Sequence, residues 1–458
     1  MAKKTVSAPA APAPANRPPY MLIEEIRVQG YKSLVGATLH VRPLTLLAGT
    51  NSSGKSSIMQ PLLLIKQTME APYQPAGALV LDGAHVQAET AGELVSAIEK
   101  ARPKFFSLGL NGKQVMGPIS FKRNFDFAYK QNDSNFAFMH HKSTSISDKA
   151  REIYITPEST WAIIHSQLDS DRQLLYNLEE TTGEVDVENG FLVFIIKDAD
   201  GAIKSTLTAT GVVENMLSSL MHIPGLRRKP ERSYAATFFK EQIKGTFDAY
   251  AAGLISQWQQ QQDTEKLAKL NDYLRRLGLT DSVTAKVKNA NEVELSVSRL
   301  PAGSKGKPRK ADMVNIADVG IGVSQVLPIL VALIAAQEGQ IVYVEQPELH
   351  LHPRAQVVMA ELLAEAANRG VRVIVETHSS LLLLTVQTLI AQDKIKNTDV
   401  ALHWFARDAK GATQVEYVQP DEDGAYGEWP EDFGDVEMKA QGAYLDAVGE
   451  RQFKRAVK

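Results

Sequence analysis

Residues 49–56 read GTNSSGKS, which satisfies the full G-x-x-x-x-G-K-[ST] pattern of a phosphate-binding loop. The largely apolar run 44–48 before the loop is typical of a buried strand, and residues 56–69 after it have helical spacing. A strand that leads into a glycine loop and then a helix is the context that the pattern requires. A Gly/Ser turn matches this pattern by chance in roughly one chain in a hundred of this length. The sequence therefore predicts a nucleotide site at this loop.

The residue types in the loop suit phosphate chemistry. Gly49 and Gly54 let the backbone turn tightly and bring its N–H groups close to phosphates. Lys55 can reach the β- and γ-phosphates, and the Ser56 hydroxyl can ligate Mg²⁺, so we expect ATP and Mg²⁺ as cofactors. The residues predicted to contact the nucleotide are Gly49, Asn51, Ser52, Ser53, Gly54, Lys55, Ser56 and Ser57.

Composition narrows the class of protein. The 458 residues are 44% hydrophobic, so the chain can bury a large core and hold more than one lobe. The net charge of -3 gives no global basic field for nucleic acid, so a DNA contact would need local patches. The absence of cysteine excludes disulfides and thiolate metal sites, and a cytoplasmic location is expected. The longest apolar stretches, 323–336 and 381–391, are too short to span a membrane.

Hydrophobic periodicity divides the chain further. The Ala/Pro-rich N-terminus is predicted to be a disordered tail. Bursts of alternating apolar and polar residues indicate an antiparallel sheet with hairpins, and spacings of three and four after Gly211 indicate helices. Pro61 predicts a kink or an early end in the helix after the loop. The predicted parts are the tail 1–20, the loop region 21–117, the antiparallel region 118–210, the helical insert 211–300 and the C-terminal region 301–458.

Two basic clusters lie outside these motifs. The segment 304–310, SKGKPRK, is interpreted as a solvated loop rather than a nucleic-acid contact, because charge runs are common on surfaces. The second cluster consists of Arg227, Arg228, Lys229 and Arg232. It can face phosphates or the carboxylates of a partner, and the sequence leaves both alternatives open.

A phosphate loop also needs a carboxylate for Mg²⁺ and water, and a group that senses the γ-phosphate. Glu345 follows the apolar run 341–344, which places its carboxylate at the end of a buried strand. The run 371–375 repeats this design and ends in Glu376, Thr377 and His378. Two parallel strands that end in polar groups create a crevice where ligands of open α/β sheets bind. His378 is therefore predicted to donate a hydrogen bond to the γ-phosphate.

His350 and His352 form an HLH segment, in which alternate residues face the same side. A metal pair is not favoured, because the sequence offers no cysteine and no obvious third ligand. These histidines are expected to orient the loop after Glu345.

Together these motifs resemble a known family. GTNSSGKSS, the segment DVGIGVSQVLP at 318–328, VEQPELHLHP and ETHSS follow one another as in the ABC-type ATPases of the RecF/SMC/OLD-like group, often labelled AAA family ATPases. Tyr31-Lys32-Ser33 resembles the FKS motif that opens such proteins. The resemblance covers residues 22–98 and about 212 to the C-terminus. It implies an α/β fold, namely an ABC-type P-loop ATPase head with an inserted antiparallel β region and a helical arm.

The resemblance also implies a composite active site. In such proteins Glu345 would hold the Walker B position, for Mg²⁺ and water, and the DVGIGVSQ segment would act as the ABC signature. The signature residues Gly320, Gly322, Ser324 and Gln325 would then contact the γ-phosphate held by another subunit. A homo-oligomer, either a head-to-tail dimer or a higher oligomer, would thus be part of the mechanism.

One position departs from the family pattern. Typical ABC proteins have Asp-Glu at the end of the Walker B strand, whereas this chain has Glu345-Gln346. A neutral amide can orient water but cannot take its proton, so either turnover is slow or Glu348 serves as the base. Similar EEPE and ENPE versions in the group indicate that this position tolerates change.

Many relatives act in prokaryotic defence against phages together with a nuclease. OLD and the Gabija ATPase carry a TOPRIM nuclease in the same chain, but no comparable acidic cluster or HNH signature follows the ATPase motifs here. Resemblance to the ATPase components of PARIS and Septu implies a separate effector, a nuclease or toxin, under the control of an ATP-driven switch. Two alternatives are an ATP-loaded scaffold with little turnover and a RecF-like DNA-repair ATPase.

Overall fold

The protein was analysed in a computed structural model, which describes residues 18–72, 79–98, 104–132, 135–146, 150–167, 182–188, 190–198, 200–208, 210–236, 242–299, 312–429 and 442–448. The predicted tail lies outside the described residues up to residue 17, as does the basic segment 304–310.

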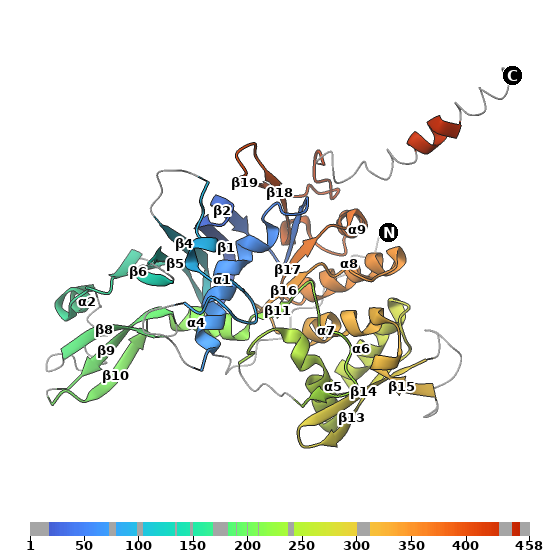
Figure 1. The fold of residues 1–458 in the computed structure, drawn as a ribbon, viewed down its shortest axis with the longest axis horizontal. Helices are drawn as coiled ribbons and strands as arrows, with labels where there is room; N and C mark the ends of the chain where they lie inside the picture. The colour runs from blue at the N-terminus through green and yellow to red at the C-terminus, as the bar shows by residue number, and fades with distance from the viewer. Residues whose placement is uncertain are drawn as a thin grey trace, which may run out of the picture.

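A central sheet of six strands carries the predicted motifs, in the order β11-β16-β17-β3-β18-β19 (Figure 1). The first five strands are parallel, and β19 pairs antiparallel with β18. The strands are β3 (Leu44–Gly49), β11 (Met221–Ile223), β16 (Ile341–Glu345), β17 (Arg372–Thr377), β18 (Val400–Arg407) and β19 (Thr413–Val418). Strand β17 therefore lies between the strand of the phosphate loop and the strand that ends in Glu345.

The central sheet is buried on both faces. Val342 and Val344 of β16 point into one hydrophobic core, whereas Ile341 and Tyr343 point into the other. This alternation follows from the two-residue period of a strand, and it explains why residues 341–344 form a continuous apolar run. The α/β fold class predicted from the sequence is confirmed.

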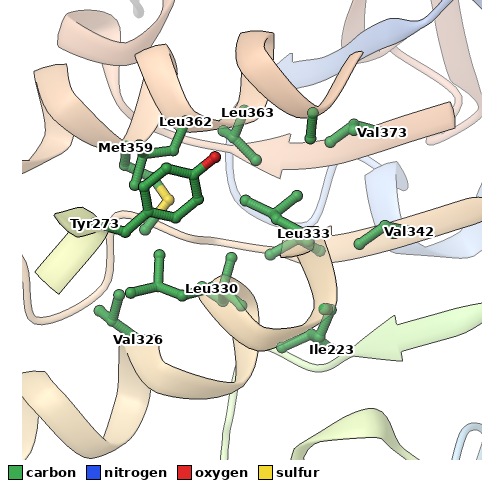
Figure 2. Packing of buried hydrophobic residues seen from close by; sticks show 14 of the residues in the cluster. Ile223, Tyr273, Val326, Leu330, Leu333, Val342, Met359, Leu362, Leu363 and Val373 are labelled. Atoms are coloured by element: carbon green, nitrogen blue, oxygen red, sulfur yellow. The ribbon is translucent and has the colours of Figure 1, made fainter. Parts of the chain in front are cut away.

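Helices cover the two faces of the central sheet. One core contains α1 (Lys55–Glu70) and α4 (Gly211–Ser219). The other contains α5 (Ala251–Gln260), α6 (Thr264–Arg276), α7 (Ile321–Ala335), α8 (Pro353–Asn368) and α9 (Ser380–Ala391). Figure 2 shows this second core, where Tyr273 of α6 packs near Met359 of α8 and Leu330 of α7.

Beside α1 lies an antiparallel sheet in the order β2-β1-β4-β5-β6-β7 (Figure 1). Its strands are β1 (Tyr20–Tyr31), β2 (Leu34–His40), β4 (Phe105–Met116), β5 (Ile119–Gln131), β6 (Phe136–Ile146) and β7 (Ala150–Ile155). Next in the chain come the helix α2 (Trp161–Gln167) and a three-stranded sheet. The strands of this sheet are β8 (Thr182–Glu188), β9 (Phe191–Lys197) and β10 (Ile203–Thr208). The predicted antiparallel strands are present, but the division expected after residue 117 falls in the β4–β5 hairpin, so β5 to β7 extend the sheet that β1 begins.

The segment 211–300 differs from the helical arm that was expected. It contains helices α4 to α6, but also the central strand β11 and the sheet β12-β14-β13, to which β15 is added. These strands are β12 (Tyr234–Ala235), β13 (Val283–Asn289), β14 (Glu292–Ser298) and β15 (Met313–Asn315). Because α5 and α6 bury their apolar sides in the same core as α7 and α8, this segment packs onto the head.

Helix α1 also differs from expectation, because it runs through Pro61 to Glu70 without a break. Pro61 is buried together with its neighbours Leu62 and Leu63. Packing of this helix against the core therefore outweighs the loss of one backbone hydrogen bond at the proline.

Candidate nucleotide site

The phosphate loop has a backbone that only glycine allows at two positions. Gly49 has φ 145, and a Cβ there would lie 2.1 Å from the Phe405 carbonyl oxygen. Gly54 has φ 100, and a Cβ there would lie 2.4 Å from Thr413 Oγ1. Helix α1 begins directly after Gly54, and no side chain of the described residues caps it. Its free N–H groups and the positive end of its dipole therefore suit an anion.

The hairpin of β18 and β19 supports the loop from behind. Thr413 Oγ1 donates to the Ser53 carbonyl at 2.8 Å and lies 2.7 Å from Ser33 Oγ. Arg407 Nε donates to the carbonyl of Ser52 at 2.6 Å, which steadies a residue with φ 59. Ser33 belongs to the FKS-like segment, whereas the contributions of Arg407 and Thr413 could not be foreseen from spacing along the chain.

Lys55 lies inside the loop rather than in solvent. Its Nζ donates to the carbonyls of Gly49 at 3.1 Å and Thr50 at 2.7 Å. Burial lowers the pKa of Lys55, and the nearby carboxylates of Glu376 and Glu348 oppose this effect. A buried cation that lacks full compensation is a favourable partner for an anionic phosphate.

Two carboxylates meet at the carboxyl edge of the central sheet. Glu345 and Glu376 are register partners at the ends of β16 and β17. The Ser56 hydroxyl donates to Glu376 Oε2 at 2.8 Å, and the Tyr343 hydroxyl donates to the same oxygen at 3.2 Å. Burial raises the pKa of Glu376, against the opposing effects of Ser56 and Lys55. Thus the carboxylate nearest to Ser56 is Glu376, for which the sequence predicted no role of its own.

Glu345 is held by the segment that follows β11. Its Oε1 lies 3.1 Å from His222 Nε2, and its Oε2 accepts the Gly225 N–H at 3.0 Å. Burial alone would raise the pKa of Glu345, but the hydrogen bonds from His222 and Gly225 bring it below its ordinary value. The carboxylate is therefore charged at neutral pH. The sequence did not predict this contact, because β11 is only three residues long and carries no periodic signal.

Three of the four basic side chains in the second basic cluster pair with carboxylates or carbonyls of the same chain. Arg227 Nη2 donates to the carbonyls of Glu345 at 2.7 Å and Gln346 at 3.1 Å. Arg228 lies 3.6 Å from Asp248, and Arg232 pairs with Asp318 at 2.6 Å. Arg227 thus connects this cluster directly to the strand end that carries Glu345.

The remaining predicted catalytic residues lie close together after β16 and β17. Gln346 has φ 46, and its N–H donates to the Glu376 carbonyl at 2.7 Å. Glu348 Oε1 accepts the backbone N–H of His378 at 2.7 Å. Burial raises the pKa of Glu348, whereas burial and the nearby Lys55 lower the pKa of His378. Glu348 therefore takes up a proton more readily than an ordinary glutamate does. His378 is neutral at neutral pH.

The signature-like segment 318–325 leads into α7, and Gly320 directly precedes the first residue of this helix. Ser324 Oγ donates to the Ile321 carbonyl at 2.9 Å, and Gln325 Nε2 donates to the Arg228 carbonyl at 3.0 Å. Gly320 is the N-cap residue of α7, Gly322 lies in its first turn, and no described side chain caps this helix. Within the described part of the chain, no hydrogen bond joins this segment to the phosphate loop.

The residues present fit a magnesium ion better than a transition metal. The Ser56 hydroxyl and the carboxylates of Glu345 and Glu376 are hard oxygen donors, and Mg²⁺ in nucleotide sites uses only one or two carboxylates beside the phosphates. Among the described residues no group of three or more His, Cys, Asp or Glu side chains is arranged to hold a metal. His352 instead accepts the Arg354 N–H at 3.3 Å and caps α8.

Comparison with known proteins identifies relatives of this chain. The family model described as "AAA domain, putative AbiEii toxin, Type IV TA system" matches residues 44–384, which is more than half of the chain. No curated protein matches the sequence. None of the helices in the described ranges is long and apolar enough to cross a membrane.

Three solved structures of SMC head domains are similar in fold. The Smc head bound to the C-winged helix domain of ScpA has 12% identity and a TM-score of 0.44, over 87% of this chain and 98% of that chain. The Smc head domain with an extended coiled coil, bound to the C-terminal domain of ScpA derived from Pyrococcus furiosus, has 10% identity and a TM-score of 0.43, over 88% and 96%. The SMC head domain from Thermotoga maritima has 11% identity and a TM-score of 0.39, over 87% and 99%.

Proposed function

Because the chain belongs to the family of AAA domains described as "putative AbiEii toxin, Type IV TA system", we propose that it binds ATP with Mg²⁺ at the phosphate loop and hydrolyses it. One observation carries this proposal: the carboxylates of Glu345 and Glu376 lie in register at the sheet edge, and Glu376 contacts Ser56. This is the set of oxygen donors that a magnesium nucleotide requires beside a phosphate loop.

Each residue of the site has a distinct role in the proposed reaction. Lys55 exchanges the carbonyls of Gly49 and Thr50 for the β- and γ-phosphates. Ser56 and Glu345 hold Mg²⁺, which when bound stabilises the negative charge that develops on the phosphates. Gly49, Gly54 and the start of α1 present N–H groups to the phosphates, beside Asn51, Ser52, Ser53 and Ser57.

The base in the proposed reaction is Glu348. Gln346 orients the attacking water but cannot accept its proton, whereas the buried Glu348 has a raised pKa, which suits proton uptake near neutral pH. His378 is neutral there and donates a hydrogen bond to the γ-phosphate. The backbone contact between His378 and Glu348 keeps both groups at one place.

We further propose that the site is completed by a second copy of the chain. Gly320, Gly322, Ser324 and Gln325 of that copy would face the γ-phosphate, and closure of the head-to-tail oligomer would control a separate effector, a nuclease or toxin, in anti-phage defence. The uncapped start of α7 and the toxin-system description of the family support this proposal. Cytoplasmic location follows from the same proposal.

Phosphate release tests the enzymatic part. Wild type should hydrolyse ATP, Lys55→Ala should lose both binding and hydrolysis, and Glu345→Gln should retain binding but hydrolyse at least about 100-fold more slowly. Glu416→Gln, an exposed carboxylate of β19, serves as the control. Equal rates for wild type, Lys55→Ala and Glu345→Gln would rule out hydrolysis at this site.

A scaffold that stays loaded with ATP is the second candidate, favoured by Gln346 at the position of the usual base. The variant Gln346→Glu separates the two functions. A large gain in turnover would show that the native chain is built to retain ATP, whereas an unchanged rate supports the enzyme. A RecF-like DNA-repair ATPase is tested by duplex DNA binding at several salt concentrations, where phosphate contacts predict a steep loss of affinity with salt.

A further inference from the structure

A cavity of about 270 Å³ lies beside the start of α7, and we call it the α7 cavity. Its polar lining consists mainly of Arg227, Arg228, Lys229, Ser324, Glu231 and Asp248. Three cations face two carboxylates, so the lining carries a net positive charge. None of the residues that line it belongs to the phosphate loop. The α7 cavity is therefore separate from the phosphate loop of the same chain, and Arg227 joins it to the strand end that carries Glu345.

The floor of the α7 cavity holds a cation with unused donors. Arg227 is only 7% exposed, and Nη2 alone is engaged by the carbonyls of Glu345 and Gln346. Its Nε and Nη1 find no hydrogen-bond partner among the described residues. An unpaired buried N–H is unfavourable, so the charge of Arg227 is only partly compensated by the two carbonyls and favours an anion nearby.

The rim of the α7 cavity adds further attraction for an anion. Arg228 and Lys229 are exposed, and Asp248 offsets part of the charge of Arg228 at a distance of 3.6 Å. Ser324 lies in the first turn of α7, where the positive end of the helix dipole has no side-chain cap among the described residues. A phosphoryl group at the rim would meet both the cations and this helix start.

The ATP bound by the same chain is poorly placed to fill the α7 cavity. The segment 224–229 follows β11, which lies three strand spacings from β3, or about 14 Å across the sheet. Apolar side chains next to the cavity residues are exposed as well: Leu226 is 94% exposed, and Ile321, one turn before Ser324, is 46% exposed. Exposed apolar side chains beside cations are typical of a surface that another protein covers.

We propose that Arg228 and Lys229, above Arg227 and beside Ser324, bind the terminal phosphate of ATP held in the phosphate loop of a second copy. This inference rests on the proposed ATPase function and adds to it the cations that act across the interface. In hydrolysis the water oxygen bonds to the γ-phosphorus while the bond to the β–γ bridging oxygen breaks, and the proton goes to the base. Arg228 and Lys229 form no covalent bond and stabilise the charge on the departing phosphates.

The double variant Arg228→Ala/Lys229→Ala tests the proposal, with Lys286→Ala on β13 as an exposed control. Because both changed side chains are exposed, the fold should be retained. Turnover should fall at least about tenfold, with ATP affinity of the isolated chain unchanged. Turnover equal to that of the wild type would overturn the proposal.

Mixing variants shows on which copy the cations act. Lys55→Ala has an intact α7 cavity, and the double variant has an intact phosphate loop. When the two variants are mixed in equal amounts, about half of the dimers contain one chain of each kind. Such a mixed dimer has one complete site out of two. About one quarter of wild-type activity should therefore return. An inactive mixture would place the cations in the site of their own chain and overturn the proposal.

Two further measurements keep the inference separate from hydrolysis itself. With Mg²⁺ and a non-hydrolysable ATP analogue, light scattering should detect association of wild type and Lys286→Ala but not of the double variant. Equal association would overturn the proposal, even if the wild type shows no turnover and the proposed function fails. Inorganic phosphate should not raise the melting temperature of Lys55→Ala; a rise that the same double change abolishes would identify free phosphate as the occupant and also overturn it.

Discussion

Replacing Arg227 by methionine separates the role of this side chain in stability from its role in the active site. Methionine has a similar length but no charge and no donor. The variant removes the hydrogen bonds from Nη2 to the carbonyls of Glu345 and Gln346. Bonds from a charged donor contribute about 1.5 to 3 kcal/mol each, so the loss amounts to about 3 to 6 kcal/mol.

Removal of a buried charge offsets much of this loss of stability. Burial lowers the pKa of Arg227 from its ordinary 12.5 to about 10, against the opposing charges of Glu348, Glu345 and Asp248. This shift corresponds to about 3 kcal/mol by which the site disfavours the charged guanidinium, and methionine escapes that penalty. The net decrease in the free energy of unfolding should therefore be about 0 to 3 kcal/mol.

The effect on hydrolysis should be larger in relative terms. Gln346 has φ 46, and its carbonyl loses the donor that helps to hold this left-handed conformation. The strand end that carries Glu345 then shifts, so turnover should fall at least about tenfold, while ATP affinity changes less than about threefold.

Steady-state phosphate release, calorimetric ATP binding and denaturant unfolding measure the three quantities. Arg299→Met, which removes an exposed side chain 3.5 Å from Asp312, is the control and should change each quantity little. If Arg227→Met hydrolysed ATP at the wild-type rate, or lost affinity and turnover in equal proportion, the positioning role of Arg227 would be refuted.

Three further predictions concern the loop and the antiparallel sheet. Gly49→Ala should abolish ATP binding in calorimetry, because its Cβ would lie 2.1 Å from the Phe405 carbonyl oxygen; Gly411→Ala, also at positive φ but in open space, should bind normally. Thr413→Val removes the contacts to Ser33 and Ser53 and should weaken ATP binding by about 1 to 2 kcal/mol, roughly tenfold, whereas Thr388→Val on α9 should not. His141 is buried beside the rings of Phe125 and Phe127, and burial lowers its pKa from 6.5 to about 3. The folded chain thus takes up this proton only at lower pH than the unfolded chain, so stability falls as the pH drops below 6.5, by about 2 kcal/mol at pH 5. His141→Phe should remove this loss in thermal unfolding at pH 5 and pH 8, and His140→Phe should remove less of it; identical pH dependence in His141→Phe and wild type would contradict the assignment.

The strands and helices that carry the motifs could be predicted because each has a strong local signal. Residues 44–49 and 341–344 are largely apolar, as expected of parallel strands with two buried faces, and both belong to central strands. The glycines of the phosphate loop mark positions where the backbone adopts positive φ. These features depend on neighbours in the sequence, so a single sequence reveals them.

The residues that contact Glu345 could not be predicted, because they are far from it in the sequence. His222, Gly225 and Arg227 reach it from more than a hundred positions earlier in the chain. Strand β11 has three residues, too few for a period, and the sequence left open whether the basic residues after it face phosphates or the carboxylates of a partner. Glu376 was visible at a strand end, but only the pairing of β17 with β3 brings it to Ser56.

The order of the central strands has a consequence for synthesis of the protein. Strand β3 leaves the ribosome early, yet its two neighbours in the sheet, β17 and β18, are made more than three hundred residues later. Until then a largely apolar strand, whose six residues are all buried in the folded protein, has both edges unpaired, a condition that favours aggregation. Fragments that end before residue 372 should be insoluble or bound to chaperones, and nucleotide binding should first become measurable when residues 372–407 have been added.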